Sequence, residues 1–75
     1  MSMEDLRNHR AMPFLKRGMR VEVLTDGRKG RIASANRSMN LNIRIDGESK
    51  SRNFHPQWML RYLDDSGKTI AEYRN

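Results

Sequence analysis

The fold is decided by residues 41–47, Leu41-Asn42-Ile43-Arg44-Ile45-Asp46-Gly47. Apolar and polar residues alternate strictly up to Ile45, and a period of two is typical of a β-strand with one buried face. Asp46-Gly47 follows at once, and an Asp-Gly pair after such a strand is a strong signal for a tight hairpin turn. The sequence therefore predicts a strand that ends at Ile45 and returns as a second strand over residues 48–54.

The same alternation, in weaker form, recurs on both sides of this hairpin. Residues 19–24, 30–35 and 59–63 each combine apolar with polar positions, and turn-forming residues separate them, including a tight turn at 55–58. Five short strands are too few for a sandwich, whereas closing them on themselves removes exposed edges and encloses one core. We therefore expect an all-β fold, with a small five-stranded barrel over residues 18–63.

The predicted barrel has one small apolar core. Alternate residues of a strand point to opposite faces of the sheet, which selects one set of side chains for the interior. Phe54 and Trp58 are expected inside, because a domain of this size has few other large residues to fill its centre. An exposed position is compatible with both Tyr62 and Tyr73. The expected core is Val21, Val23, Ile32, Leu41, Ile43, Ile45, Phe54, Trp58, Leu60 and Leu63.

Two segments lie outside the predicted barrel, residues 1–17 and residues 64–75. Ser2 has the spacing of a capping box with Asp5, which predicts a short helix over residues 3–11. Such a helix is marginal without a surface to dock on, so a disordered tail is the alternative for this segment. The C-terminal segment is expected to be a loose tail or to add one short strand.

Composition restricts the protein to a small basic domain. The 75 residues include 15 Lys and Arg against 9 Asp and Glu, which gives a formal charge of +6. The absence of Cys excludes disulfides and thiolate zinc sites. The longest apolar stretch, residues 11–15, is far too short for a membrane helix. We expect a cytoplasmic protein that is a monomer or a weak dimer.

Basic residues are concentrated in the middle of the chain. Twelve of the 15 lie from Arg7 to Arg52, and 11 of the 15 are Arg, whose planar guanidinium binds phosphate bidentately. This pattern favours RNA or DNA as partner, bound through phosphates with low sequence specificity. The alternative is a charged surface that serves only solubility. The expected contact residues are Arg28, Lys29, Arg31, Arg37, Arg44 and Arg52.

Residues suited to catalysis or metal binding are few and scattered. His9 and His55 are the only histidines, and neither has carboxylates at a ligand-like spacing. Gly27-Arg28-Lys29-Gly30 lacks the Gly-Lys-Ser/Thr ending of a phosphate-binding P-loop. We therefore expect no enzymatic activity, no metal and no cofactor.

Two stretches of the sequence resemble known protein groups. Residues 18–32, with Gly18-Met19-Arg20-Val21-Glu22-Val23 and Gly27-Arg28-Lys29-Gly30-Arg31-Ile32, resemble the KOW motif. That resemblance implies a barrel of the Src-homology-3-like type, with RNA or protein contacts through its loops. Residues 40–47 with His55-Pro56-Gln57-Trp58 resemble short proteins of phages and prophages.

The alternative function is a protein adaptor that accepts a peptide or a host protein at the barrel loops or at a strand edge.

Overall fold

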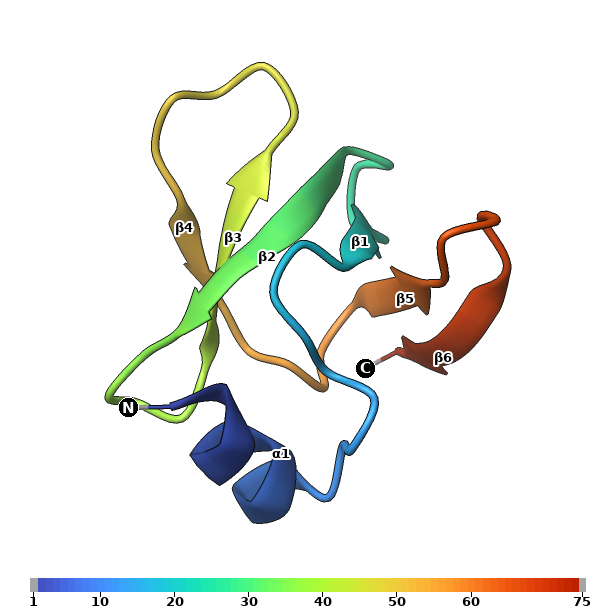
Figure 1. Ribbon diagram of the computed structural model, residues 1–75. Helices are drawn as coiled ribbons and strands as arrows, with labels where there is room; N and C mark the ends of the chain where they lie inside the picture. Colours follow the sequence, from blue (N-terminus) through green and yellow to red (C-terminus); the bar gives the residue numbers. More distant parts are fainter. Residues whose placement is uncertain (1, 75) are drawn as a thin grey trace.

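The computed structural model describes residues 2–74, which form one helix and six antiparallel strands (Figure 1). The strand order across the single sheet is β4-β3-β2-β1-β5-β6. The predicted all-β fold with a short N-terminal helix is confirmed. The elements are α1 Met3–Arg10, β1 Arg20–Val23, β2 Lys29–Ala35, β3 Leu41–Ile45, β4 Arg52–Phe54, β5 Leu60–Leu63 and β6 Thr69–Tyr73.

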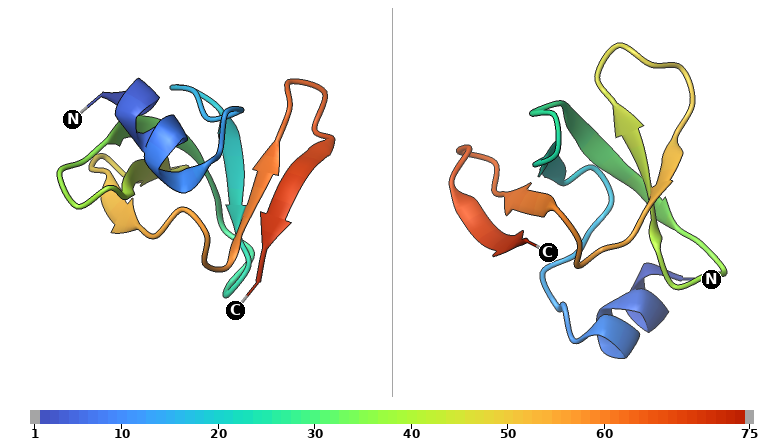
Figure 2. Two further views of the ribbon diagram at one scale, coloured as in Figure 1. Left: turned by 90° about the horizontal axis from the view of Figure 1, so that it is seen from below. Right: turned by 180° about the vertical axis from the view of Figure 1, so that it is seen from behind.

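The sheet is open, and the predicted closed barrel is wrong. β4 and β6 are its two edge strands, and the β3–β4 and β5–β6 pairs lie on opposite sides of the molecule (Figures 1 and 2). Closure over residues 18–63 fails for two physical reasons. β6 pairs with β5, from Leu60 opposite Tyr73 to Leu63 opposite Thr69, and so moves the edge beyond the predicted boundary. In addition, side chains of the N-terminal segment cover the core where the sheet leaves it open.

The N-terminal segment is an ordered helix rather than a disordered tail. The predicted capping box is present, because the amide of Asp5 donates to Ser2 Oγ at 3.1 Å and Asp5 Oδ2 accepts from the amide of Ser2 at 3.5 Å. The helix ends at Arg10 and is capped by Ala11, which adopts a left-handed conformation with φ 55°. These caps satisfy backbone groups that an isolated short helix leaves unpaired.

Docking supplies the stability that the helix lacks on its own. Leu6 of α1 and Met12 and Leu15 beyond it are fully buried in the core. Arg10 Nε donates to the carbonyl of Met39 at 3.0 Å, which ties the end of α1 to the loop between β2 and β3. The sequence did not indicate this docking, because two of the three buried anchors follow the helix and are not spaced along its face.

Seven of the ten predicted core residues are buried, and β5 accounts for part of the difference. β5 pairs Tyr62 with Val21 and Leu63 with Arg20, so Tyr62 points inward and Leu63 outward. Tyr62 is accordingly fully buried and Leu63 only half-buried. Trp58 lies in the turn before β5 and is 50% exposed. The predicted core positions of Trp58 and Leu63 are therefore wrong, while half-buried Phe54 packs against the edge of the core.

Tyr62 is the largest side chain of the core and carries its one buried hydroxyl. Its ring makes edge contacts with Phe14, at 5.3 Å between centroids, and with Tyr73, at 6.0 Å. Its hydroxyl donates to the carbonyl of Pro56, so the buried oxygen is satisfied. Burial, with a smaller effect of Tyr73, raises the pKa of Tyr62 well above its ordinary value.

Replacement of Leu6 tests whether the helix belongs to the core. Leu6→Ala leaves a cavity at a fully buried site and should lower the free energy of unfolding by about 2–5 kcal/mol. Leu63→Ala, at an outward-facing site, is the matched control and should cost less than about 1.5 kcal/mol. Urea denaturation measures both. Equal losses would contradict the assignment of inner and outer positions.

The Tyr62 hydroxyl should make stability fall at alkaline pH. A raised pKa keeps the Tyr62 hydroxyl neutral in the folded state at pH values where the unfolded chain ionises. The free energy of unfolding is therefore unaffected by this group below a pH of about 10 and falls by roughly 1.4 kcal/mol per pH unit above it. Tyr62→Phe removes this decline but leaves the Pro56 carbonyl unpaired, at about 1–3 kcal/mol. The stability difference between the two proteins should therefore shrink from pH 7 to pH 11 in urea denaturation. A constant difference would refute this role.

Candidate nucleic-acid interface

The predicted contact residues do not form one cluster. Arg28 and Arg52 meet through Glu48 at one end of the sheet, where the turns after β1 and β3 lie. Arg31 and Arg44 are opposed across β2 and β3. Of the remaining two, Lys29 is the first residue of β2, and Arg37 lies in the loop that follows β2.

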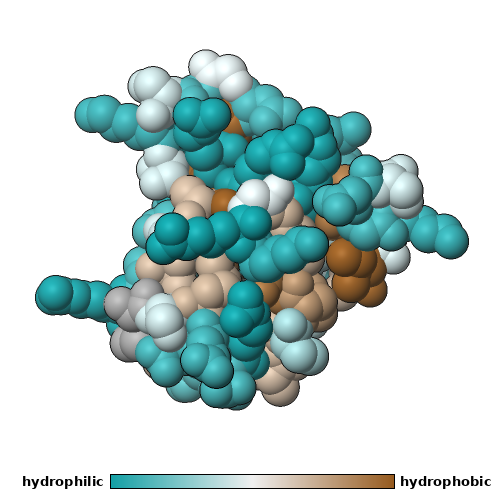
Figure 3. All heavy atoms as spheres, in the orientation of Figure 1, coloured by the Kyte–Doolittle hydropathy of each residue, from teal (hydrophilic) through white to brown (hydrophobic). Residues whose placement is uncertain are grey.

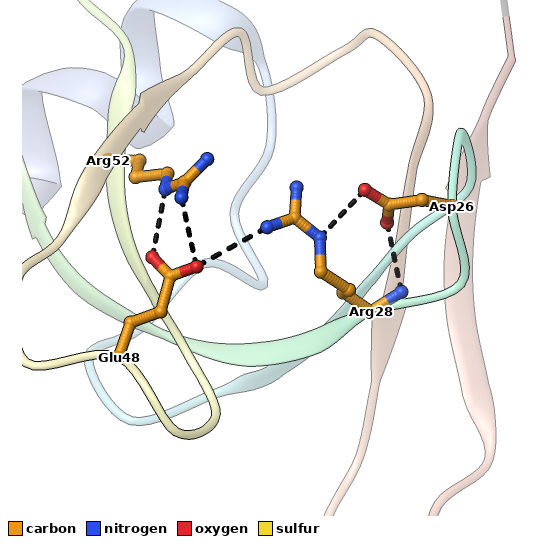
Figure 4. Close-up of polar contacts among 4 residues, drawn as sticks. All are labelled: Asp26, Arg28, Glu48 and Arg52. Atoms are coloured by element: carbon orange, nitrogen blue, oxygen red, sulfur yellow. Dashed lines mark hydrogen bonds and ion pairs between the residues drawn. The ribbon is translucent and has the colours of Figure 1, made fainter.

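Arg28 and Arg52 are neutralised by neighbouring carboxylates (Figure 4). Arg52 binds Glu48 bidentately, at 2.8 and 3.0 Å, and Arg28 Nη1 reaches the same carboxylate at 3.4 Å. Arg28 Nε also donates to Asp26 at 2.7 Å, and the backbone amide of Arg28 holds the pKa of Asp26 below its ordinary value. This group of two cations and two anions has no net charge, so it offers little attraction for an outside anion.

Three arginines stand side by side on the outer face of the sheet. In the pairing of β1 with β2, Arg20 lies opposite Arg31, and in the pairing of β2 with β3, Arg31 lies opposite Arg44. Directly opposed residues of antiparallel strands project from the same face. Their sequence neighbours Val21, Ile32 and Ile43 are buried on the inner face, which places this arginine row, Arg20, Arg31 and Arg44, outside.

The arginine row has little internal compensation. Among residues 2–74, one carboxylate lies within ion-pair distance of the arginine row. It is Asp46, whose Oδ2 is 3.7 Å from Arg20 Nη1. Arg31 Nη1 donates to the carbonyl of Gly18 at 2.9 Å, which orients its guanidinium without neutralising it. The Arg44 side chain is exposed and has no hydrogen bond or ion pair to any other described residue. Like charges placed opposite each other on a sheet destabilise it, so this row does not serve the fold.

The adjacent row of the same face is built differently. Glu72, Arg61, Glu22 and Lys29 follow one another across β6, β5, β1 and β2, with alternating charge. Arg61 binds Glu22 at 2.9 Å and Glu72 at 2.8 Å, and it lowers the pKa of Glu72. In this row Arg61 is therefore paired with carboxylates across two strands, in contrast to the arginine row.

Arg20 is not among the six contact residues expected from the sequence. The available signal was its alternation with Val21 in a strand that a short turn joins to the strand of Arg31. Alternation alone assigns a residue to a face, whereas membership of a row requires the register between strands. Arg37, in contrast, is exposed in the loop after β2 and lies outside the row.

Other kinds of site receive no support within residues 2–74. This part of the chain contains no detected pocket and no group of three or more side chains arranged to hold a metal. Its single helix is too short and too polar to cross a membrane. Comparisons with protein families, curated proteins and solved structures find no match to this chain.

Removal of one charge from the arginine row should stabilise the protein. Arg44→Gln relieves repulsion with Arg31 and should raise the free energy of unfolding by about 0.2–1 kcal/mol at low salt, with the gain fading near 1 M salt, where the screening length is about 3 Å. Arg74→Gln is the matched control, since Arg74 is paired with Glu72. Urea denaturation across a salt series measures the effect. A loss of stability in Arg44→Gln would mean that Arg44 makes a favourable contact in the fold.

Proposed function

We propose that this protein binds RNA or DNA with low sequence specificity, by contacting phosphates through the arginine row. The observation that supports it is the alignment of Arg20, Arg31 and Arg44 on three adjacent strands, with one carboxylate beside them. Arginine forks bind phosphate bidentately, and phosphate contacts position a protein without reading sequence. A bound nucleic acid would supply the negative charge that the row lacks.

The spacing of the row suits a repeating anion. Neighbouring strands lie about 4.8 Å apart, so the outer two α-carbons are separated by roughly 10 Å, and long arginine side chains extend that reach. A surface of this length can engage more than one phosphate of the same nucleic acid. The formal charge of +6 adds long-range attraction for a polyanion.

The ion pairs of the structure change the set of proposed phosphate-contacting residues from the six expected from the sequence. Arg31 and Arg44 are retained and Arg20 is added, while Lys29 lies in the adjacent row and Arg37 in the loop after β2. Arg28 and Arg52 are given a minor part, because Glu48 and Asp26 already occupy their donors. The KOW resemblance of residues 18–32 supports the proposal, since it includes two of the three arginines. We propose binding without catalysis, in the cytoplasm.

A second candidate function is that of a protein adaptor, and the β6 edge favours it. The pairing of β5 with β6 has an irregularity at which Ile70 is the extra residue, and Ile70 is 41% exposed. Figure 3 shows that the largely hydrophilic surface is interrupted by apolar areas. An exposed edge strand with an apolar side chain can pair with an extended peptide.

A double replacement in the arginine row should weaken binding and flatten its salt dependence. Each lost phosphate contact lowers the slope of log affinity against log salt by about 0.7 on single strands and 0.9 on duplex. Arg31→Ala with Arg44→Ala should therefore reduce the slope by about 1.4–1.8. Fluorescence anisotropy with labelled single- and double-stranded RNA and DNA measures it.

The matched control removes two positive charges that flank β6, the edge strand farthest from β2 and β3 on that side. Lys68→Ala with Arg74→Ala has the same effect on net charge and should leave the slope unchanged. Equal slopes for both double variants would contradict a localised site. If the parent protein binds none of the four nucleic acids more tightly than about 100 μM at 50 mM salt, the weak end of non-specific affinity, the proposal fails and the adaptor function is favoured.

A further inference from the structure

A row of neutral polar side chains continues the outer face beyond the arginine row. Ser34, Asn42 and Asn53 are opposed across β2, β3 and β4. The pairing of β2 with β3 shifts between Ile32 and Ser34, so Ala33 is an extra residue in β2. This bulge returns Ser34 to the outer face, in the row next to the arginine row along β2. We call Ser34, Asn42 and Asn53 the amide row.

Asn36, in the loop after β2, fixes the orientation of these amides. Its Oδ1 accepts from the backbone amides of Ser38, at 3.0 Å, and Asn40, at 3.2 Å, so its Nδ2 is necessarily the donor. Nδ2 donates to Oδ1 of Asn42 at 3.1 Å and to Oδ1 of Asn53 at 2.7 Å. Backbone groups thus determine which side of each amide is engaged within the cluster.

The result is a surface with unused hydrogen-bond donors. With their oxygens engaged by Asn36, Asn42 and Asn53 keep their Nδ2 groups for other partners. Asn42 Nδ2 donates one hydrogen bond to Ser34 Oγ at 2.9 Å. The Nδ2 group of exposed Asn53 has no partner among residues 2–74. The arginine row beside it consists of donors alone. The two rows together form a continuous donor-rich face across β1 to β4.

We propose that the amide row is a second contact row for the same nucleic acid, and that Asn53 donates to phosphodiester oxygens. This inference rests on the proposed function of the arginine row. Phosphodiester oxygens only accept hydrogen bonds, whereas base edges and peptides present donors as well. A donor-rich face therefore matches the backbone that all nucleic acids share. Because Asn53 is neutral, it adds affinity without releasing counterions.

Asn53→Ala tests this contact through salt dependence. Loss of a neutral hydrogen bond should weaken binding by about 3- to 10-fold at every salt concentration, with the salt slope unchanged. Anisotropy titrations use short labelled oligo(dT) and oligo(dA), and the loss should be the same for both. Asn8→Ala is the matched control, since Asn8 is exposed on α1, and it should bind like the parent.

Three results would overturn the inference. Unchanged affinity in Asn53→Ala, while the parent binds normally, would remove Asn53 from the contact surface and leave the arginine row intact. A loss confined to oligo(dA) or to oligo(dT) would mean that Asn53 reads a base. Absence of binding by the parent protein would reject the proposed function together with this inference. Circular dichroism of Asn53→Ala should match the parent, because the residue is exposed on an edge strand.

Discussion

The close approach of β2 to β3 at Gly30 is the constraint on which the rest of the structure depends. A Cβ atom at this position would lie 2.5 Å from the carbonyl oxygen of Arg44, so no larger residue fits without moving β3. With Gly30 opposite Ile45, the next pairs are Arg31 with Arg44 and Ile32 with Ile43. The first of these pairs belongs to the outer face and the second to the core. A slip of one residue would exchange the two faces, so core packing enforces the alignment of the arginines.

The outer face combines a cost to the fold with a capacity for binding. Paired charges, as between Arg61 and Glu22, are what a sheet surface needs for stability, and they occupy the row beside the arginines. Arg31 and Arg44 lack such partners, and their repulsion is tolerated because the core on the other face is well packed. The bulge at Ala33 adds neutral donors at the next step of the same face. Function is therefore proposed where like charges are opposed at a cost to the fold, as is common for binding surfaces.

Sequence patterns predict the elements of this protein better than their arrangement. The strand over residues 41–45, a turn at Asp46-Gly47 and seven core residues follow from local alternation and turn chemistry. The predicted return strand over residues 48–54 is too long, because β4 begins only at Arg52, opposite Ile43, and a longer loop precedes it. The inward position of Tyr62 does not, because two apolar phases compete in β5 and only pairing with β1 selects one. The open sheet depends on Leu15 and other N-terminal anchors that no helical period reveals. For the candidate site, alternation places Arg31 and Arg44 on one face, but neither their opposition nor the neutralisation of Arg28 is visible without the register.

The proposed nucleic-acid interface is the outer face of β1–β3. Its most direct test is a titration of the ¹⁵N-labelled protein with a short oligonucleotide. The chemical shifts of the backbone amides and of the arginine Nε–H groups are monitored by NMR. We expect the largest shifts at Arg20, Arg31 and Arg44. Shifts at Arg28 and Arg52 should be small, because carboxylates hold their guanidinium groups. Shifts concentrated at Ile70 on the β6 edge, or an unperturbed arginine row at saturating ligand, would contradict it.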